Sequence, residues 1–338
     1  MLKKFSLGIS ARRAQWATAW YSKVLLRGTV SLGELRAAVG RIGFVCGALR
    51  YDRLFLAPLY ALIGALGRKR FIGTDTEVSL PKFLRMVFGW LLLRIQSRRH
   101  ERCDFEDASA GQLFRVDAKA EGECIVFGGW KPVCGPNGAP DPWLSPWFSV
   151  RLDQTTAPWA YDRSGRPFRV VSALELLAST VAFMLFAPDA VEGQRLRAGV
   201  RVTSWTDSQV SVAAAFKGLS TSYPLCLVQM ELAAQLESKR AVLEPDWAPR
   251  DLNQEADDLT NEVFGAFDPR QRVDVSMSNL PWLVFTDLVS HARTFYADIL
   301  AAQSETRSSG AAAPAHAHRV RPHRLGLKRV GLRHTDPW

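Results

Sequence analysis

The sequence predicts a mixed α/β domain at residues 101–265, preceded by a helical region and followed by a helical extension and a tail. Two observations predict this class. Short apolar runs bounded by turn residues alternate with longer apolar segments, which gives the order β-β-β-α-β-α-α-β-α and therefore a mixed sheet flanked by helices. The hydrophobic fraction of 47% also suffices for a sizeable core, which excludes a globally disordered chain.

Residues 1–100 are predicted to be helical and basic. Ser31 is expected to cap a helix over about 32–40, because Glu34 stands three residues later in the capping-box position. Apolar runs at 54–66 and 80–96 have helical spacing and predict two further helices. Both runs are shorter than the roughly 20 apolar residues of a membrane span, so we expect helices that pack on one another and no membrane partner.

The predicted sheet begins with two strands, 111–118 and 123–130, joined by a tight connection. A stretch rich in Pro, Trp and Gly at 131–146 predicts a loop. A third strand is expected at 147–152, and it continues irregularly over 157–161.

The second half of the domain alternates between helices and strands. The expected elements are helix 170–186, strand 199–206, helix 208–217, helix 225–238, strand 241–243 and helix 255–264. Beyond the domain, residues 266–303 are expected to form an extension with a helix at 288–303. Residues 304–338, rich in Ser, Gly, Ala, Pro, His and Arg, are expected to be a disordered basic tail.

Four acidic residues are the candidate functional groups of this domain: Asp117, Glu175, Asp207 and Asp257. Carboxylates at strand ends and in apolar helices cost free energy unless something pairs with them. A pair of divalent cations is one physical reason to gather four of them. Asp107 competes with Asp117 for the first position, and we prefer Asp117 because an apolar run leads into it.

Taken singly, two of these acids have a simpler interpretation. Asp207 stands directly before the predicted helix at 208–217 and is equally suited to cap it. Asp257 and its neighbour Asp258 suit solvated acids near a helix N-terminus. The order of all four acids along the chain favours a common site.

Each acid lies in a short motif, and the motifs follow one another in a recognisable order. They are Phe114-Arg115-Val116-Asp117-Ala118 followed by Ile125-Val126-Phe127-Gly128-Gly129-Trp130, then Ser172-Ala173-Leu174-Glu175-Leu176-Leu177-Ala178, Thr206-Asp207-Ser208-Gln209-Val210, and Asn253-Gln254-Glu255-Ala256-Asp257-Asp258-Leu259-Thr260. In this order, residues 107–265 resemble the ribonuclease H-like domain of a DIRS-type retroelement polyprotein. The segments 31–35, 40–44 and 53–60 resemble the thumb and connection region that follows a reverse transcriptase palm, so the resemblance covers about residues 20–265.

The resemblance implies a ribonuclease H-like fold and a two-metal endonuclease that cleaves the RNA strand of RNA–DNA hybrids. It implies two Mg²⁺ or Mn²⁺ ions, bridged by Asp117, with Glu175 and Asp207 on one ion each and Asp257 completing the second site. On the same basis Ser208, Lys217 and Asn253 are expected to contact the substrate.

Two features depart from the family pattern. The loop 246–250 has no histidine, which leaves open a catalytically decayed domain that only binds nucleic acid. No aromatic-x-Asp-Asp motif is present, because the single Asp-Asp pair, Asp257-Asp258, follows Glu255-Ala256. We therefore expect no polymerase activity and interpret the chain as the downstream part of a retroelement polyprotein, with the palm supplied upstream or in trans. A translated fragment of a dead element is a further alternative.

Charge and cysteine content agree with a nucleic-acid partner inside the cell. Residues 1–100 hold 18 Lys and Arg against 4 Asp and Glu, and residues 304–338 hold 7 against 2, whereas the segment between them is net acidic. Basic ends suit a polyanion binder, although they also serve solubility alone. Five cysteines without a C-x-x-C pair argue against a disulfide framework and a structural zinc site, so cytoplasm or nucleus is expected.

Overall fold

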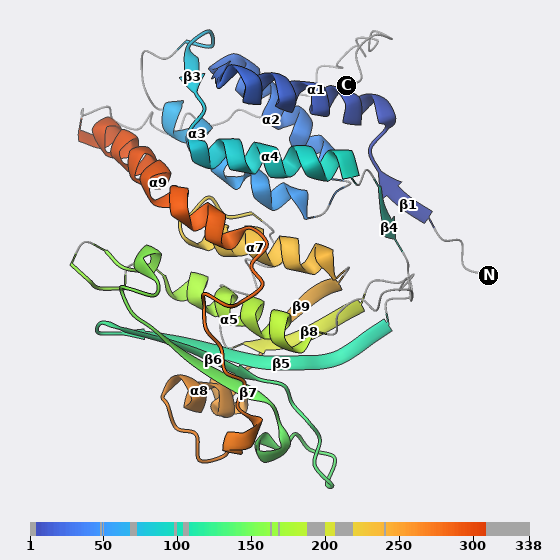
Figure 1. Cartoon of the computed structure of the whole chain (residues 1–338), viewed down its shortest axis with the longest axis vertical. Helices are drawn as coiled ribbons and strands as arrows, with labels where there is room; N and C mark the ends of the chain where they lie inside the picture. Colours follow the sequence, from blue (N-terminus) through green and yellow to red (C-terminus); the bar gives the residue numbers. More distant parts are fainter. Residues whose placement is uncertain are drawn as a thin grey trace, which may run out of the picture. The chain divides into compact units, whose positions relative to one another are not determined.

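The computed structural model describes residues 5–308 except 48, 50, 68–72, 98–99, 104–107, 163, 168–169, 188–199, 207–218 and 240. The chain divides into two compact units (Figure 1). The first unit, called here the sheet unit, contains Met1–Ser6, Tyr51–Ala57 and Arg102–Ser290. The second, called here the helical unit, contains Leu7–Arg50, Pro58–Glu101 and His291–Trp338.

The sheet unit is built on a mixed five-stranded sheet with the order β7-β6-β5-β8-β9. The strands are β5 (Ala108–Glu121), β6 (Cys124–Trp130), β7 (Trp147–Leu152), β8 (Val200–Thr206) and β9 (Ala241–Trp247). The first three strands form antiparallel pairs, and β8 and β9 run parallel to β5. In chain order, the strands therefore lie third, second, first, fourth and fifth across the sheet.

Helices cover both faces of this sheet. Helix α5 (Val171–Phe186) lies on one face and is packed by α7 (Leu225–Ser238), whereas α8 (Gln254–Thr260) lies on the other (Figure 1). Helix α5 is apolar on all sides and almost entirely buried, as expected of a helix enclosed by a sheet and a second helix. Beneath α8, Trp130, Trp147 and Phe267 form a separate aromatic cluster.

The helical unit contains α1 (Ala11–Arg27), α2 (Leu32–Val45), most of α3 (Ala57–Leu66) and α4 (Lys82–Ser97). Strands β2 (Thr29–Ser31) and β3 (Glu77–Ser79) pair antiparallel. The predicted cap is confirmed, because the Glu34 N–H donates to Ser31 Oγ at 3.2 Å.

The remaining elements of the described chain are one long helix, two short strands and five 3-10 helices. They are β1 (Phe5–Gly8), β4 (His100–Cys103), α9 (Phe285–Ser308) and the 3-10 helices η1 (Asp52–Leu56), η2 (Pro142–Leu144), η3 (Pro158–Ala160), η4 (Arg250–Leu252) and η5 (Pro269–Gln271). None of the described helices is long and apolar enough to cross a membrane.

Three sequence expectations differ from the structure. The irregular strand expected at 157–161 is wrong, because Pro158 begins the 3-10 helix η3. Strand β9 continues past residue 243 to Trp247, and helix α9 continues to Ser308, past the start of the tail expected at residue 304. The helix expected at 208–217 and residues 309–338 of the expected tail lie outside the described residues.

Candidate functional site

Asp117 lies on the central strand β5, with its side chain on the face covered by α8. The carboxylate is 7% exposed, and Thr260 Oγ1 on α8 lies 2.8 Å from its Oδ2. The same hydroxyl lies 2.9 Å from the main-chain oxygen of Asp257, so Thr260 connects the segments that carry two of the predicted acids. A nearly buried carboxylate is therefore held in a fixed orientation by a polar partner.

The cross-strand neighbour of Asp117 is Gly128 on β6, and this glycine explains how close α8 can come. A Cβ atom at position 128 would lie 2.9 Å from Leu259 Cβ and 3.0 Å from the main-chain oxygen of Phe148. Any larger side chain would push α8 away from the sheet. The glycine thus sets the distance between the strand that carries Asp117 and the helix that carries Thr260.

Glu175 lies on α5, on the opposite side of the sheet from α8 (Figure 1). It is 5% exposed, and Thr206 Oγ1 lies 3.4 Å from its Oε2. Thr206 is the last residue of β8, whose parallel register pairs Trp205 with Arg115 on β5. Glu175 is therefore anchored at the end of the strand that leads the chain toward Asp207.

Three predicted site residues, Asp207, Ser208 and Lys217, lie outside the described residues, as does the competing acid Asp107. Within the described part of the chain, no three His, Cys, Asp or Glu side chains gather closely enough to hold a metal ion. The structure therefore places two of the four acids in buried positions. Asp117 lies on β5 beside α8, and Glu175 lies on α5 beside the end of β8.

Asp257 lies on α8, where its carboxylate forms an ion pair with Arg250 of the preceding loop. Arg250 Nε lies 3.0 Å from Asp257 Oδ1, and Asn261 Nδ2 donates to Oδ2 at 2.8 Å. A cation site that used Asp257 would need Arg250 to turn away. The Arg250 side chain is 71% exposed, so this movement meets little packing resistance.

Asn253, predicted to contact substrate, has a clear positioning role in this structure. It is 1% exposed, and its Nδ2 donates to the main-chain oxygen of Val116 at 3.0 Å. Its Oδ1 is buried and has no hydrogen-bond partner among the described residues. Asn253 thereby fastens the start of α8 to the residue that precedes Asp117, and a substrate contact stays a prediction.

Arg115 is a residue of this site that the sequence did not identify. Its guanidinium stacks over Trp205 at 4.4 Å and Trp130 at 5.2 Å from the ring centroids, and Nη1 donates to the Leu252 oxygen at 3.2 Å. Burial lowers the pKa of Arg115, and the charge of Glu255, 3.6 Å away, opposes that effect. The available sequence signal was a tryptophan near the end of each of the two strands that flank β5, namely Trp130 on β6 and Trp205 on β8.

Comparisons with known proteins give low-scoring similarities to solved structures. No family model matches the chain, and no curated protein matches it. A crystal structure of RNase H1 from the halophilic archaeon Halobacterium salinarum is similar at 15% identity and a TM-score of 0.30, covering 46% of this chain and 98% of that one. The N-terminal RNase H domain of a Mycobacterium tuberculosis protein is similar at 16% identity and a TM-score of 0.29, covering 46% and 94%.

With TM-scores near 0.3, the fold class follows from the strand order and the helices of this chain. The order third-second-first-fourth-fifth, with helices on both faces, is a ribonuclease H-like mixed α/β fold, which confirms the predicted fold class.

Proposed function

We propose that the ribonuclease H-like region is a metal-dependent endonuclease that cleaves the RNA strand of RNA–DNA hybrids. The observation that carries the proposal is the burial of two predicted carboxylates, Asp117 on β5 and Glu175 on α5. They belong to the two elements beside the end of β8, after which Asp207 follows in the chain. Buried carboxylates are retained where a cation or a strong donor compensates for their lost hydration.

The donor set suits a hard divalent cation. Carboxylate oxygens are the preferred ligands of Mg²⁺ and Mn²⁺. We propose that Asp117, Glu175, Asp207 and Asp257 would hold two such ions. When bound, two such metal ions supply an activated water and neutralise charge on the scissile phosphate.

The chain's own residues orient these ligands. Thr260 holds the Asp117 carboxylate, and Thr206 holds that of Glu175. Arg250 neutralises Asp257, so we expect it to exchange the carboxylate for solvent or a phosphate when the site is loaded. Recognition of the RNA strand would rest on its 2′-hydroxyl groups.

A second candidate function is favoured by the ion pair between Arg250 and Asp257. If that pair persists, the fourth carboxylate does not reach a cation, and the domain binds hybrid without cutting it. The absence of histidine from the loop 246–250 points the same way. Under both candidates we propose RNA–DNA hybrid as the partner, and a retroelement reverse transcriptase as the wider context.

The test uses a hybrid labelled on its RNA strand, incubated with Mg²⁺ or Mn²⁺ and the full chain. We expect cleavage by the parent and at least a hundredfold slower cleavage by the variants Asp117→Asn and Glu175→Gln, with hybrid affinity retained. Asp258→Asn is the matched control, since this neighbouring acid is not assigned to the metal site. Equal cleavage by the parent and both variants would reject the assignment, and binding without cleavage by the parent would favour the second candidate.

A further inference from the structure

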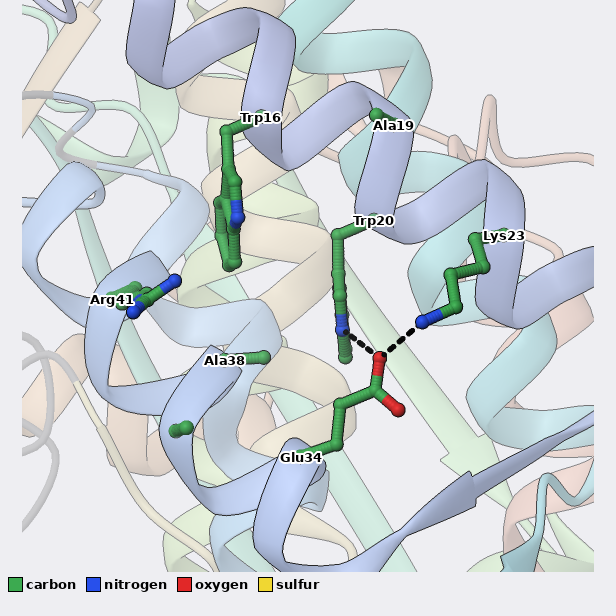
Figure 2. Close-up of a pocket in the computed structure, with 8 residues that line it drawn as sticks. Trp16, Ala19, Trp20, Lys23, Glu34, Ala38 and Arg41 are labelled. Atoms are coloured by element: carbon green, nitrogen blue, oxygen red, sulfur yellow. Dashed lines mark hydrogen bonds and ion pairs between the residues drawn. The ribbon is translucent and has the colours of Figure 1, made fainter. Parts of the chain in front are cut away.

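Helices α1 and α2 of the helical unit line an open surface cavity of about 380 Å³ (Figure 2). Two indole rings, two cationic side chains, one carboxylate and small alanine side chains line it: Trp16, Trp20, Lys23, Arg41, Glu34, Ala37 and Ala38. This combination differs from a hydrophobic core gap, which has no charged groups along its wall. The cavity is far from the acids in sequence and plays no part in the proposed hydrolysis.

The two indoles form a slot with parallel walls. Trp16 and Trp20 stand one turn apart on α1, with ring centroids 6.4 Å apart and planes inclined by 11°. Figure 2 shows both rings nearly edge-on with space between them. Stacked bases repeat at about 3.4 Å, so two such spacings come close to the separation of these rings. The centroid separation is therefore close to that of two rings with one flat ring stacked between them.

The wall formed by Trp20 is rigid. Its ring packs edge-to-face against Tyr21 at 5.3 Å and Phe88 at 5.4 Å, and its Nε1 donates to Glu34 Oε1 at 3.2 Å. Trp16 is half-buried, and the Arg41 guanidinium lies 5.2 Å from its ring centroid. A preformed slot of this kind avoids much of the entropy cost of ordering side chains when a ligand binds.

The charged groups at the slot indicate the chemistry of its ligand. Glu34 accepts from Lys23 Nζ at 3.0 Å, which fixes a carboxylate where it can accept from an amino group on a ring. Lys23 remains 54% exposed, and Figure 2 shows Arg41 beside Trp16, on the side away from Trp20. Residues 1–100, which contain this slot, hold 18 basic residues against 4 acidic ones. Flat rings, amino groups and negative charge occur together in nucleotides.

We infer that this slot binds one unpaired base of a single-stranded nucleic acid, stacked between Trp16 and Trp20, with the neighbouring phosphates near Lys23 and Arg41. Base–aromatic stacking with flanking cations is a sequence-tolerant way to hold a single strand. The site goes beyond the proposed hydrolysis and does not depend on it.

The experiment measures binding of fluorescein-labelled 12-mers of dT and U to the full chain by anisotropy, in EDTA so that no metal-dependent cleavage occurs. An abasic 12-mer of the same length reports the contribution of phosphates alone. Trp16→Ala is expected to weaken binding of the base-containing strands roughly 5- to 150-fold, and Trp16→Phe to restore part of the loss. The parent should bind the abasic strand about as weakly as Trp16→Ala binds dT.

Two further variants separate stacking from folding. Ala37→Phe fills the slot while keeping both indoles, and it should weaken binding as Trp16→Ala does. Trp143→Ala removes an exposed tryptophan in the sheet unit and should leave the affinity unchanged. Circular dichroism establishes that each variant is folded. Three results would each overturn the inference. The first is unchanged affinity in Ala37→Phe and Trp16→Ala, and the second is equal binding of abasic and natural strands. The third is competition by an acidic tryptophan-containing peptide but not by mononucleotides.

Discussion

Replacement of Arg115 by methionine should destabilise the sheet unit, because this one side chain links β5 to the loop before α8. Two cation–π contacts at 4.4 and 5.2 Å are worth about 0.5–2 kcal/mol each. The charged hydrogen bond to the Leu252 oxygen adds about 1.5–3 kcal/mol. Relief of the desolvation that lowers the pKa of Arg115 offsets part of this, so we expect a net loss of about 2–4 kcal/mol.

Thermal unfolding followed by tryptophan fluorescence measures this loss. For a unit of this size, about 2–4 °C of melting temperature corresponds to each kcal/mol, so Arg115→Met should lower it by roughly 4–16 °C. Arg115→Lys keeps the charge but loses the planar guanidinium. Its melting temperature should therefore lie between those of Arg115→Met and the parent. Arg151→Gln breaks an exposed ion pair with Glu262 and is the control, with a change under about 1 kcal/mol.

The same variants separate a structural role from a role in the site. Since Arg115 holds η4, and η4 leads into α8, we expect Arg115→Met to slow hybrid cleavage at temperatures where it remains folded, whereas Arg151→Gln should not. A melting temperature of Arg115→Met equal to that of the parent would refute the reasoning, because the stack would then contribute nothing.

Three further outcomes are expected. Glu231 is fully buried on α7 and accepts from the main-chain N–H groups of residues 283–285 at 3.0, 2.8 and 2.8 Å. Glu231→Leu should therefore lower the free energy of chemical unfolding by about 3–5 kcal/mol, and an equally stable variant would contradict this. Gly128→Ala should cost about 1–3 kcal/mol and slow hybrid cleavage, since the added methyl group meets Leu259. Gly265→Ala is the control, because its φ lies outside the left-handed region and no neighbouring atom lies within 4 Å of the added methyl group. Hydrogen bonds from Arg270 keep the pKa of Asp268 below its ordinary value, so the contribution of Asp268 to stability is present at neutral pH and is lost as pH falls through the folded-state pKa. Asp268→Asn should therefore lose less stability than the parent when the pH is lowered into the acidic range. An equal loss of stability in the two proteins would count against this prediction.

Much of the fold was predictable because its elements carry local signals. The predicted helix at 225–238 and strand at 147–152 coincide with α7 and β7. The bounds of helix α1, within the region predicted to be helical, were missed because alanines such as Ala14 and Ala17 form part of its buried face, and small side chains give a weak periodic signal. Strand β9 was predicted too short because Pro245 interrupts the run, yet an edge strand tolerates proline.

The candidate site was predictable only in part. The burial of Asp117 and Glu175 follows from the apolar runs that contain them. The stacking of Arg115 between Trp130 and Trp205 depends on strand order, which no local pattern specifies. The ion pair of Asp257 likewise depends on how the loop before α8 folds back.

The central claim is tested most directly by offering the full chain four labelled substrates in Mn²⁺: an RNA–DNA hybrid, double-stranded RNA, double-stranded DNA and single-stranded RNA. We predict cleavage of the RNA strand of the hybrid alone, and its loss in Asp117→Asn. Hybrid left intact by a folded parent chain, or cut equally by Asp117→Asn, would contradict the account.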